Sequence, residues 1–149
     1  MEKIKILFTA LMSAFFSAFG LLAIPLLLLV GSNVVDYATG LMATTNRKQK
    51  ISSYKGIRGI FKKVSMYLLV IVGFFIDTLI NYTVTNLGMS FEIPALVSCV
   101  IAVWLVCNEI ISILENLIDM DVDLPPFVIP LVKMIKGQTE DKISIKEVK

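Results

Sequence analysis

The stretch ILFTALMSAFFSAFGLLAIPLLLLVGSNVV, residues 6–35, decides the fold because it holds no charged side chain. Asp36 is the only charged residue from there as far as Asn46. One continuous helix over residues 6–46 would be roughly 60 Å long, about twice the thickness of a hydrocarbon core. The stretch therefore predicts two membrane helices joined by a break.

Gly20 and Pro25 supply that break, because glycine tolerates turn conformations and proline removes a backbone hydrogen-bond donor. We expect a short helix at about 7–19 and a second span at about 22–42. A cleaved signal peptide is the rival interpretation of the N-terminal stretch, where two lysines precede an apolar core. No polar region with a small-x-small cleavage site follows, which argues against removal.

The composition also indicates a lipid environment, since 56% of the 149 residues are hydrophobic and 17% are charged. The mean hydropathy is +0.82. The net charge of +2 is too small and too unevenly placed for a nucleic-acid partner. The chain has no histidine and no Cys-x-x-Cys pair, so we expect no metal, no cofactor and no enzymatic activity. Cys99 and Cys107 would lie about 12 Å apart in a helix, too far for a disulfide.

Two further apolar runs predict a span at about 64–82 and another at about 93–118. Residues 83–92 between them carry one acidic residue and no lysine or arginine, as in an external loop. Residues 47–63 carry seven lysines or arginines and no acid, which marks a cytoplasmic segment. Apolar residues recur there at helical spacing, so we expect a basic amphipathic helix lying on the anionic inner leaflet.

Charge also sets the expected topology. The N-terminal lysines, the basic loop and the lysine-bearing tail all favour the cytoplasm. Four spans place all of them there, whereas three spans would export the N-terminus. We therefore predict an all-α integral membrane protein with about four transmembrane helices, three being the alternative, and both termini in the cytoplasm. Residues 1–124 form the expected transmembrane domain, and residues 125–149 form a polar cytoplasmic tail.

Ionisable residues inside these spans need a structural or functional explanation, because inserting each one into the membrane costs about 2.5–3.5 kcal/mol of free energy. The last span is predicted to carry one polar stripe that lines water or binds partner helices. It consists of Asn108, Ser112, Glu115 and Asn116, with Asp119 at its end. A plainer interpretation places Asp36, Glu109 and Glu115 near the cytoplasmic interface, hydrated or paired with Lys62 or Lys63. Asp77 is flanked by apolar residues, and Asn81 offers it a local hydrogen-bond partner.

Three local strings resemble the toxin-secretion/phage-lysis holin family: DYATG at 36–40, SSYKGIRGIFKK at 52–63 and NEIISILEN at 108–116. The resemblance runs from about residue 26 to residue 134 and includes the Pro125–Pro126 exit after the last span. It implies a bacteriophage holin, which accumulates in the host cytoplasmic membrane and then oligomerises into lesions. Endolysin, or in some relatives a large clostridial toxin, escapes through these lesions.

The resemblance further implies a homo-oligomer in the bilayer, with endolysin as a functional partner that needs no direct contact. We expect oligomer contacts or lesion lining from a set of polar residues: Asp36, Asp77, Asn108, Glu109, Ser112, Glu115 and Asn116. We expect anchoring to the anionic membrane surface from four basic residues: Lys55, Arg58, Lys62 and Lys63. A small ion channel or transporter, or a membrane anchor protein, is the alternative function.

Overall fold

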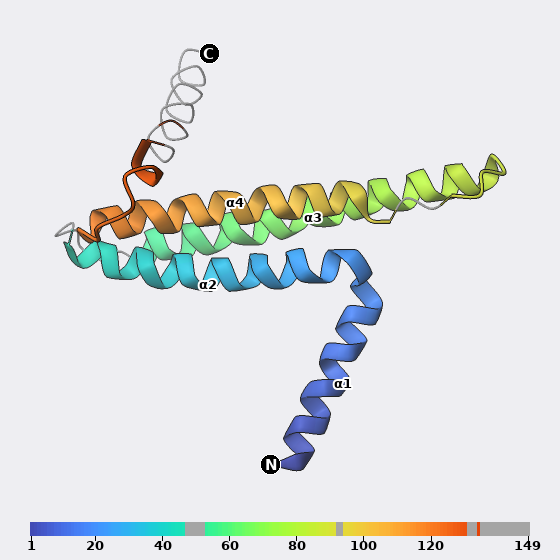
Figure 1. Cartoon of the computed structure of the whole chain (residues 1–149), viewed down its shortest axis with the longest axis horizontal. Helices are drawn as coiled ribbons and strands as arrows, with labels where there is room; N and C mark the ends of the chain where they lie inside the picture. Colours follow the sequence, from blue (N-terminus) through green and yellow to red (C-terminus); the bar gives the residue numbers. More distant parts are fainter. Residues whose placement is uncertain (47–52, 92–93, 131–133, 135–149) are drawn as a thin grey trace.

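The computed structural model describes residues 1–46, 53–91, 94–130 and 134, and its described elements are helices joined by turns (Figure 1). The chain begins with α1 (Glu2–Phe19) and a single 3-10 turn, η1 (Gly20–Leu22). Three long helices follow: α2 (Ala23–Asn46), α3 (Ser53–Asn86) and α4 (Leu96–Asp119). The predicted all-α class is confirmed.

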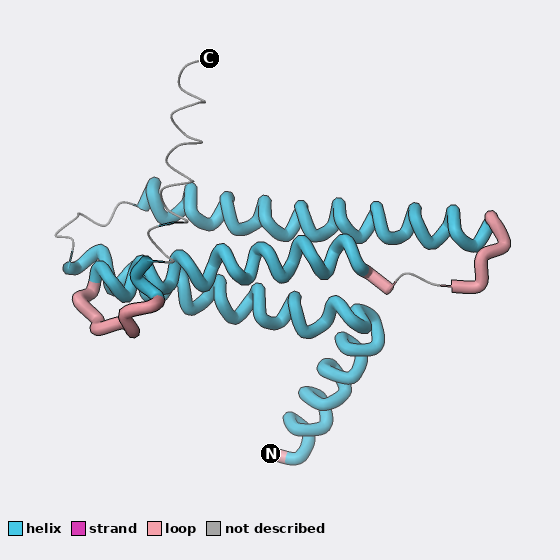
Figure 2. Tube along the Cα trace, turned by 45° about the horizontal axis from the view of Figure 1, so that its top comes forward, coloured by secondary structure: helices cyan, strands magenta, loops and turns pink. Residues whose placement is uncertain are grey.

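Helices α2, α3 and α4 form a bundle, with α4 packed against both α2 and α3 (Figure 2). Helices α2 and α4 run in the same direction, and α3 runs the opposite way (Figure 1). One end of the bundle therefore holds the end of α2, the start of α3 and the end of α4. We call this the basic end, because the basic residues of 47–63 adjoin it in the sequence.

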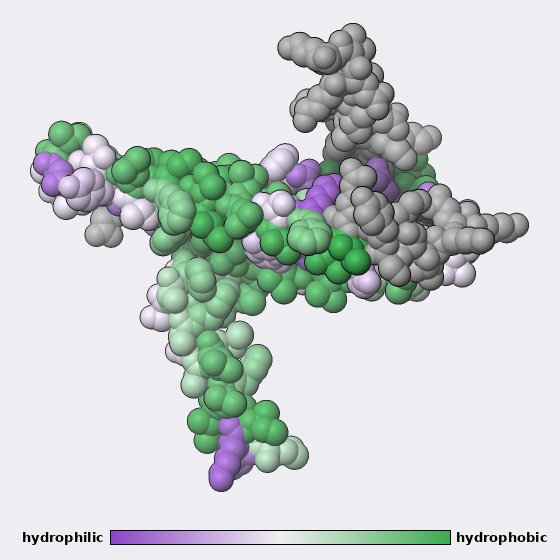
Figure 3. Space-filling view, turned by 180° about the vertical axis from the view of Figure 1, so that it is seen from behind, coloured by the Kyte–Doolittle hydropathy of each residue, from purple (hydrophilic) through white to green (hydrophobic). Residues whose placement is uncertain are grey.

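The face of the bundle seen in Figure 3 is largely apolar, with polar residues gathered toward the helix ends. Large side chains such as Leu28, Phe75 and Trp104 are more than half exposed. A water-soluble monomer rarely exposes so continuous an apolar surface, whereas lipid accepts it. Within the described residues, three helical stretches are long and apolar enough to cross a membrane: Glu2–Thr45, Gly59–Asn86 and Leu96–Asp119. The chain is a membrane protein.

Helix α1 leaves the bundle at a steep angle instead of lying along it (Figure 1). Gly20 has φ +49°, a left-handed conformation that side chains with a Cβ rarely adopt, and it turns the chain between α1 and α2. None of the residues of α1 is buried. At 18 residues α1 is about 27 Å long, close to the thickness of a hydrocarbon core. The four-span count therefore stays a prediction.

Helix α3 corrects the expectation of a separate amphipathic helix before the third span. It is continuous over 34 residues, so the segment from Ser53 belongs to the same helix as the third span, whose apolar stretch begins at Gly59. No proline interrupts this segment, and its two glycines are compatible with a helix that packing supports. Residues 47–52, including Arg47 and Ser52, lie outside the described residues, as do the side chains of Lys55 and Arg58.

Small and branched apolar side chains fill the bundle at the end opposite the basic end. The buried apolar cluster consists of Leu22, Leu29, Val70, Ala102 and Leu105. On α4 the fully buried positions are spaced by three and four residues from Ser98 to Glu109, the pattern of a helix seam packed against its neighbours. The same seam continues toward the basic end with polar residues, and these form the candidate site.

Candidate functional site

Each of the three bundle helices turns polar on its inner face as it approaches the basic end. Helix α2 contributes Asn33 and Asp36, α3 contributes Lys63, and α4 contributes Glu109 and Asn116. We call these five residues the Lys63 cluster. The spacings 33–36 on α2 and 109–116 on α4 keep each pair on one helix face, so all five side chains point into the bundle.

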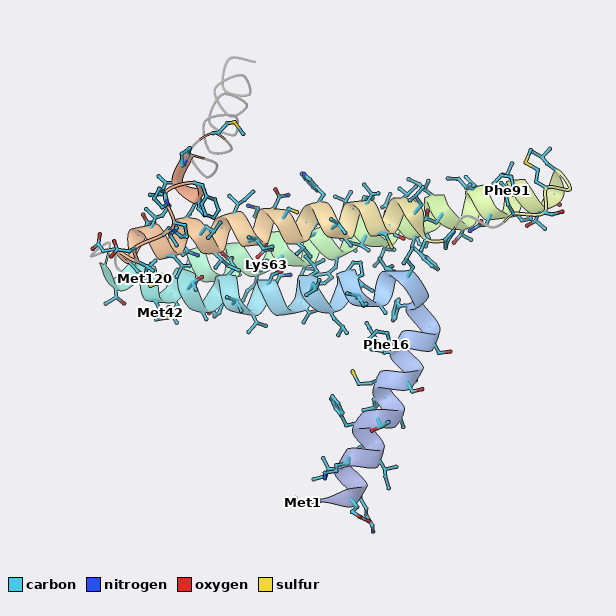
Figure 4. All side chains as sticks on the ribbon, in the orientation of Figure 1. Met1, Phe16, Met42, Lys63, Phe91 and Met120 are labelled. Carbon is cyan, nitrogen blue, oxygen red and sulfur yellow. The ribbon has the colours of Figure 1, made fainter. Side chains whose placement is uncertain are left out.

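Lys63 lies at the centre of the cluster (Figure 4). Its Nζ donates a hydrogen bond of 2.9 Å to Asp36 Oδ2 and another of 2.9 Å to Asn33 Oδ1. It donates a third hydrogen bond to Glu109 Oε2 on α4. One ammonium group thereby joins all three helices, with a carboxylate from each of its two neighbours.

Amide groups complete the network on both sides of the ion pairs. Asn33 Nδ2 donates to the Tyr67 hydroxyl at 2.9 Å, which adds a second link between α2 and α3. Asn116 Nδ2 donates to Asp36 Oδ1 at 3.2 Å and to Thr39 Oγ1 at 3.2 Å, which links α4 to α2. Among the described residues, no buried side-chain nitrogen or oxygen lacks a hydrogen-bond partner, as a low-dielectric interior requires.

The charges of the cluster lie deep in the bundle. Asp36 is ten residues from the last residue of α2, Lys63 is ten from the first of α3, and Glu109 is ten from the last of α4. At the rise of an α-helix this places all three about 15 Å from the basic end. About 20 Å of α2 and α4 lie beyond them. A hydrocarbon core of about 30 Å centred on the bundle would therefore enclose the cluster.

Asp77 forms a second, separate polar site, 14 residues along α3 from Lys63 and so about 21 Å away. Its side chain is buried, and it accepts hydrogen bonds from Val97 N at 2.8 Å, Ser98 N at 2.9 Å and Ser98 Oγ at 2.6 Å. These groups belong to the first turn of α4, where the helix dipole favours a negative charge. Asp77 thus caps α4 from α3.

Close contact between α3 and α4 makes this cap possible. Gly73 is one helical turn before Asp77, and a Cβ built on it would lie 2.9 Å from Ser98 Cα and 2.8 Å from Ile101 Cδ1. No other residue type fits there without moving α4. The absence of a side chain at Gly73 brings the start of α4 within reach of the carboxylate.

The structure brings together four of the predicted site residues: Asp36, Glu109 and Asn116 from the polar set, and Lys63 from the basic set. Asp36 and Glu109 pair with Lys63, one of the partners that the plainer interpretation named, while the position of the acids near the cytoplasmic interface stays a prediction. Asn108, Ser112 and Glu115 are half-buried on α4. On α4 the buried polar residues are Glu109 and Asn116. They are seven residues apart, which places them on the same face of the helix, whereas Asn108 lies to one side of that face.

Of the four basic residues predicted at the membrane surface, the structure describes the side chains of Lys62 and Lys63, and the surface role of the four stays a prediction. Lys63 lies inside the bundle with its charge bound to two carboxylates, whereas its neighbour Lys62 is exposed. Adjacent residues on a helix point about 100° apart, so one faces the interior and the other faces outward. Helix α4, which corresponds to the span predicted at about 93–118, runs from Leu96 to Asp119.

Several residues of both sites were absent from the sequence-based prediction. Asn33 and Tyr67 bridge α2 and α3, and Ser98 holds Asp77. For Asn33 a signal existed, because it is three positions before Asp36 and so shares its helix face. For Ser98 there was none, because its partner is 21 positions away and on another helix.

The interactions that these residues offer are ion pairs and hydrogen bonds. Among the described residues, no group of three or more His, Cys, Asp or Glu side chains is placed to hold a metal ion. Cys99 and Cys107 are free thiols. Both polar sites join helices of one chain, so they explain how the bundle holds together in lipid, where apolar contact alone drives little association.

Comparison with known proteins assigns the family. The model of the bacteriophage holin family matches residues 13–137, which include the whole bundle and both polar sites. The chain belongs to the bacteriophage holin family. Holins are non-enzymatic membrane proteins, and the predicted resemblance to a holin family is confirmed.

Relatives of this holin-family chain occur in several bacteria. An uncharacterised protein of Halalkalibacterium halodurans is 33% identical over 104 residues, 70% of this chain and 72% of the relative. An uncharacterised protein of Clostridium perfringens is 29% identical over 83% of this chain and 84% of its own length. One of Listeria innocua is 28% identical over 73% of this chain and 69% of its own length. No solved structure matches the holin-family chain.

Proposed function

We propose that this protein acts as a holin: it accumulates in the bacterial cytoplasmic membrane, oligomerises, and opens lesions through which endolysin or a toxin leaves the cell. Family membership supports this proposal, together with a bundle whose outside is apolar and whose polar groups face inward. Such a chain can reside in the membrane without harm to the cell while its polar groups find their hydrogen-bond partners within the chain.

The Lys63 cluster is the observation that carries the proposal. Its partners come from α2, α3 and α4 of one chain, so a single copy satisfies all of them. When bundles associate, the same faces can exchange their partners for those of neighbouring copies or turn towards water. The cluster therefore supplies a polar lining for a lesion and a reason why an isolated bundle stays closed.

The basic end would face the cytoplasm by the positive-inside rule. The tail that follows α4 would then be cytoplasmic, and the start of α2 would lie at the outer face. Helix α1 returns the N-terminus to the cytoplasm if it crosses the membrane, as four spans require. Its two lysines and terminal amine favour that side.

The test is inducible expression in bacteria together with a cytoplasmic endolysin and, separately, a folded fluorescent protein. We expect normal growth, then abrupt loss of viability with release of the folded protein. Slow ion leakage without protein release would instead indicate a channel or transporter. Insertion with neither leakage nor release would indicate a membrane anchor. Either result would contradict the proposal.

Variants that replace an acidic residue of the Lys63 cluster by its neutral amide test whether the cluster takes part in lesion formation. Asp36→Asn and Glu109→Gln are expected to change the time of lysis and the size of the cross-linked oligomer. Asp123→Asn is the matched control, because Asp123 is exposed and lies beyond the end of α4. Unchanged timing and oligomer size in both cluster variants would remove the cluster from the mechanism.

A further inference from the structure

An apolar groove lies between α2 and α3 at the end of the bundle opposite the basic end. Helix α4 packs against both of these helices, whereas the backbones of α2 and α3 approach each other less closely. The groove has a volume of about 270 Å³ and no polar surface. Its described walls come from η1, α2 and α3, and none from α4: Leu22, Leu26, Tyr67, Val70, Ile71 and Phe74. On this side the bundle has room for a fourth helix.

Helix α1 has a face with the shape to fill such a groove. Large side chains gather on this face at spacings of four, three and four residues: Phe8, Met12, Phe15 and Phe19. Small residues between Thr9 and Ser17 take the opposite face. Helices that dock in apolar grooves anchor themselves by side chains at this spacing. An apolar cavity of about 150 Å³ already holds a benzene ring, so the groove has room for aromatic side chains.

Within its own chain, α1 leaves most of this face uncovered. None of the residues of α1 is buried, and Phe8 and Phe19 are 62% and 42% exposed. Gly20, at φ +49°, directs α1 away from the bundle (Figure 1). Of the residues of α1, only Phe19 reaches the wall of the chain's own groove. One chain therefore offers both an open groove and an uncovered helix face that fits it.

We propose that the groove between α2 and α3 of one copy binds α1 of a second copy, and that the groove of the second copy binds α1 of the first. Exchange of an identical element in this way gives each copy the fourth helix of its bundle. The inference rests on the proposed function, in which copies associate in the membrane, and it names the surface through which they associate.

A lipid acyl chain is the other occupant that the membrane offers. An acyl chain held in the groove gives up conformational freedom that it has in the bilayer, whereas an aromatic side chain on a helix has few torsions to lose. Helices in lipid associate through close van der Waals packing, which rigid rings in a shaped groove provide. Both arguments favour the helix as the occupant.

The positions of the residues along the helices predict which of them meet. With its N-terminus on the side of the basic end, α1 of the second copy runs parallel to α3. Both helices rise about 1.5 Å per residue. When Phe19 lies level with Phe74 at the end of the groove, Phe15 therefore lies level with Val70 and next to Ile71.

Disulfide cross-linking in membranes tests this contact, in a full chain whose Cys99 and Cys107 are replaced by alanine. One copy carries Phe15→Cys, and a second copy with a different affinity tag carries Ile71→Cys. We expect oxidation to give dimers that contain both tags. Val72→Cys is the matched control, because Val72 is 49% exposed and points about 100° away from Ile71 at nearly the same depth. It should give no such dimers above background.

A variant that fills the groove tests the same contact without new cysteines. Ile71→Trp places a large ring in the groove, and Ile71 is 46% exposed, so the substitution leaves the buried core intact. Energy transfer between copies labelled with donor and acceptor dyes at their N-termini should fall in phosphatidylethanolamine–phosphatidylglycerol vesicles. Val72→Trp places the same ring on the lipid side of α3 and should leave the transfer unchanged.

Three results would overturn the inference. A disulfide that forms only within a single chain carrying both Phe15→Cys and Ile71→Cys would mean that α1 folds into its own groove. A disulfide in neither arrangement would leave the groove to lipid. Equal energy transfer in Ile71→Trp and the unaltered chain would place the contact between copies elsewhere.

Failure of this inference is distinguishable from failure of the proposed function. Lysis with protein release but without the disulfide between two copies would remove this interface and leave the holin function in place. The disulfide between two copies without protein release would remove the holin function and leave this interface in place.

Discussion

The bundle holds negative charge in two places, and it neutralises that charge in two different ways. Asp77 receives hydrogen bonds from the backbone and hydroxyl groups at the start of α4, so a helix end serves as its partner. Asp36 and Glu109 depend on the side chain of Lys63. The first arrangement joins two helices at one end of α4, and the second joins three helices deep in the bundle.

The two kinds of partner also differ in how easily they can move. The partners of Asp77 are mostly backbone groups, which stay in place as long as α4 remains a helix. The partners in the Lys63 cluster are long side chains from separate helices, and these can part when the helices part. We therefore regard Asp77 as a structural cap and the Lys63 cluster as the part of the bundle that responds to assembly.

The largest expected effect is that of Lys63→Met. The substitution leaves the carboxyl groups of Asp36 and Glu109 buried without a counter-ion, and removing one partner of a buried pair costs about 3–5 kcal/mol. The free energy of unfolding is measured for the purified chain by titration of mixed micelles with a denaturing detergent, followed by circular dichroism.

Lys62→Met is the matched control, because it removes the same charge one position away on the exposed side of α3. It should leave the unfolding free energy nearly unchanged. Equal effects of the two substitutions would mean that the cluster contributes nothing beyond net charge, and the comparison between the two sites would fail.

Asp77→Ala should have the next largest effect, about 2–3 kcal/mol, because it leaves the donors of Val97 and Ser98 unpaired inside the bundle. Asp77→Asn keeps one acceptor oxygen for these donors and should lose less. The same detergent titration measures both variants. If the two destabilise equally, the cap depends on the charge of Asp77 and not on its hydrogen bonds.

Gly73→Ala should cost about 2 kcal/mol through overpacking of α3 against α4. The added Cβ would meet the backbone of Ser98, which cannot move without the whole helix. Gly31→Ala is the control, because a Cβ there meets nothing within 4 Å and alanine favours the helix. We expect it to leave stability unchanged or raise it. Stability equal to that of the unaltered chain in Gly73→Ala would contradict the close contact that positions Asp77.

The sequence predicted the helices because the physical signal for them is local. Apolar runs long enough to cross lipid, such as the stretch at residues 6–35, report directly on the solvent around them. The direction of α1 could not be predicted in the same way. It depends on one backbone torsion at Gly20, and glycine is compatible with many values of that torsion.

The candidate site was predicted in part for a related reason. Charged residues inside an apolar span stand out, so Asp36, Asp77 and Glu109 were identified as needing partners. Which partners they find depends on the relative rotation and depth of three helices, which no single helix encodes. Lys63 was assigned to the surface because it belongs to a basic run in the sequence, although its direction on the helix faces the interior.

The smallest expected effect is that of Tyr67→Phe, and it tests how far the Lys63 cluster extends. The substitution removes the hydroxyl that accepts from Asn33 Nδ2 and leaves the ring in place. One lost hydrogen bond should cost about 1 kcal/mol. Tyr82→Phe, at an exposed position on α3, should cost nothing in the same titration. If Tyr67→Phe is also silent, the network ends at Asn33. If instead its effect approaches that of Lys63→Met, the hydroxyl helps to hold Asn33 against the ammonium. The contacts of Tyr67, Asn33 and Lys63 are then lost together when the cluster opens.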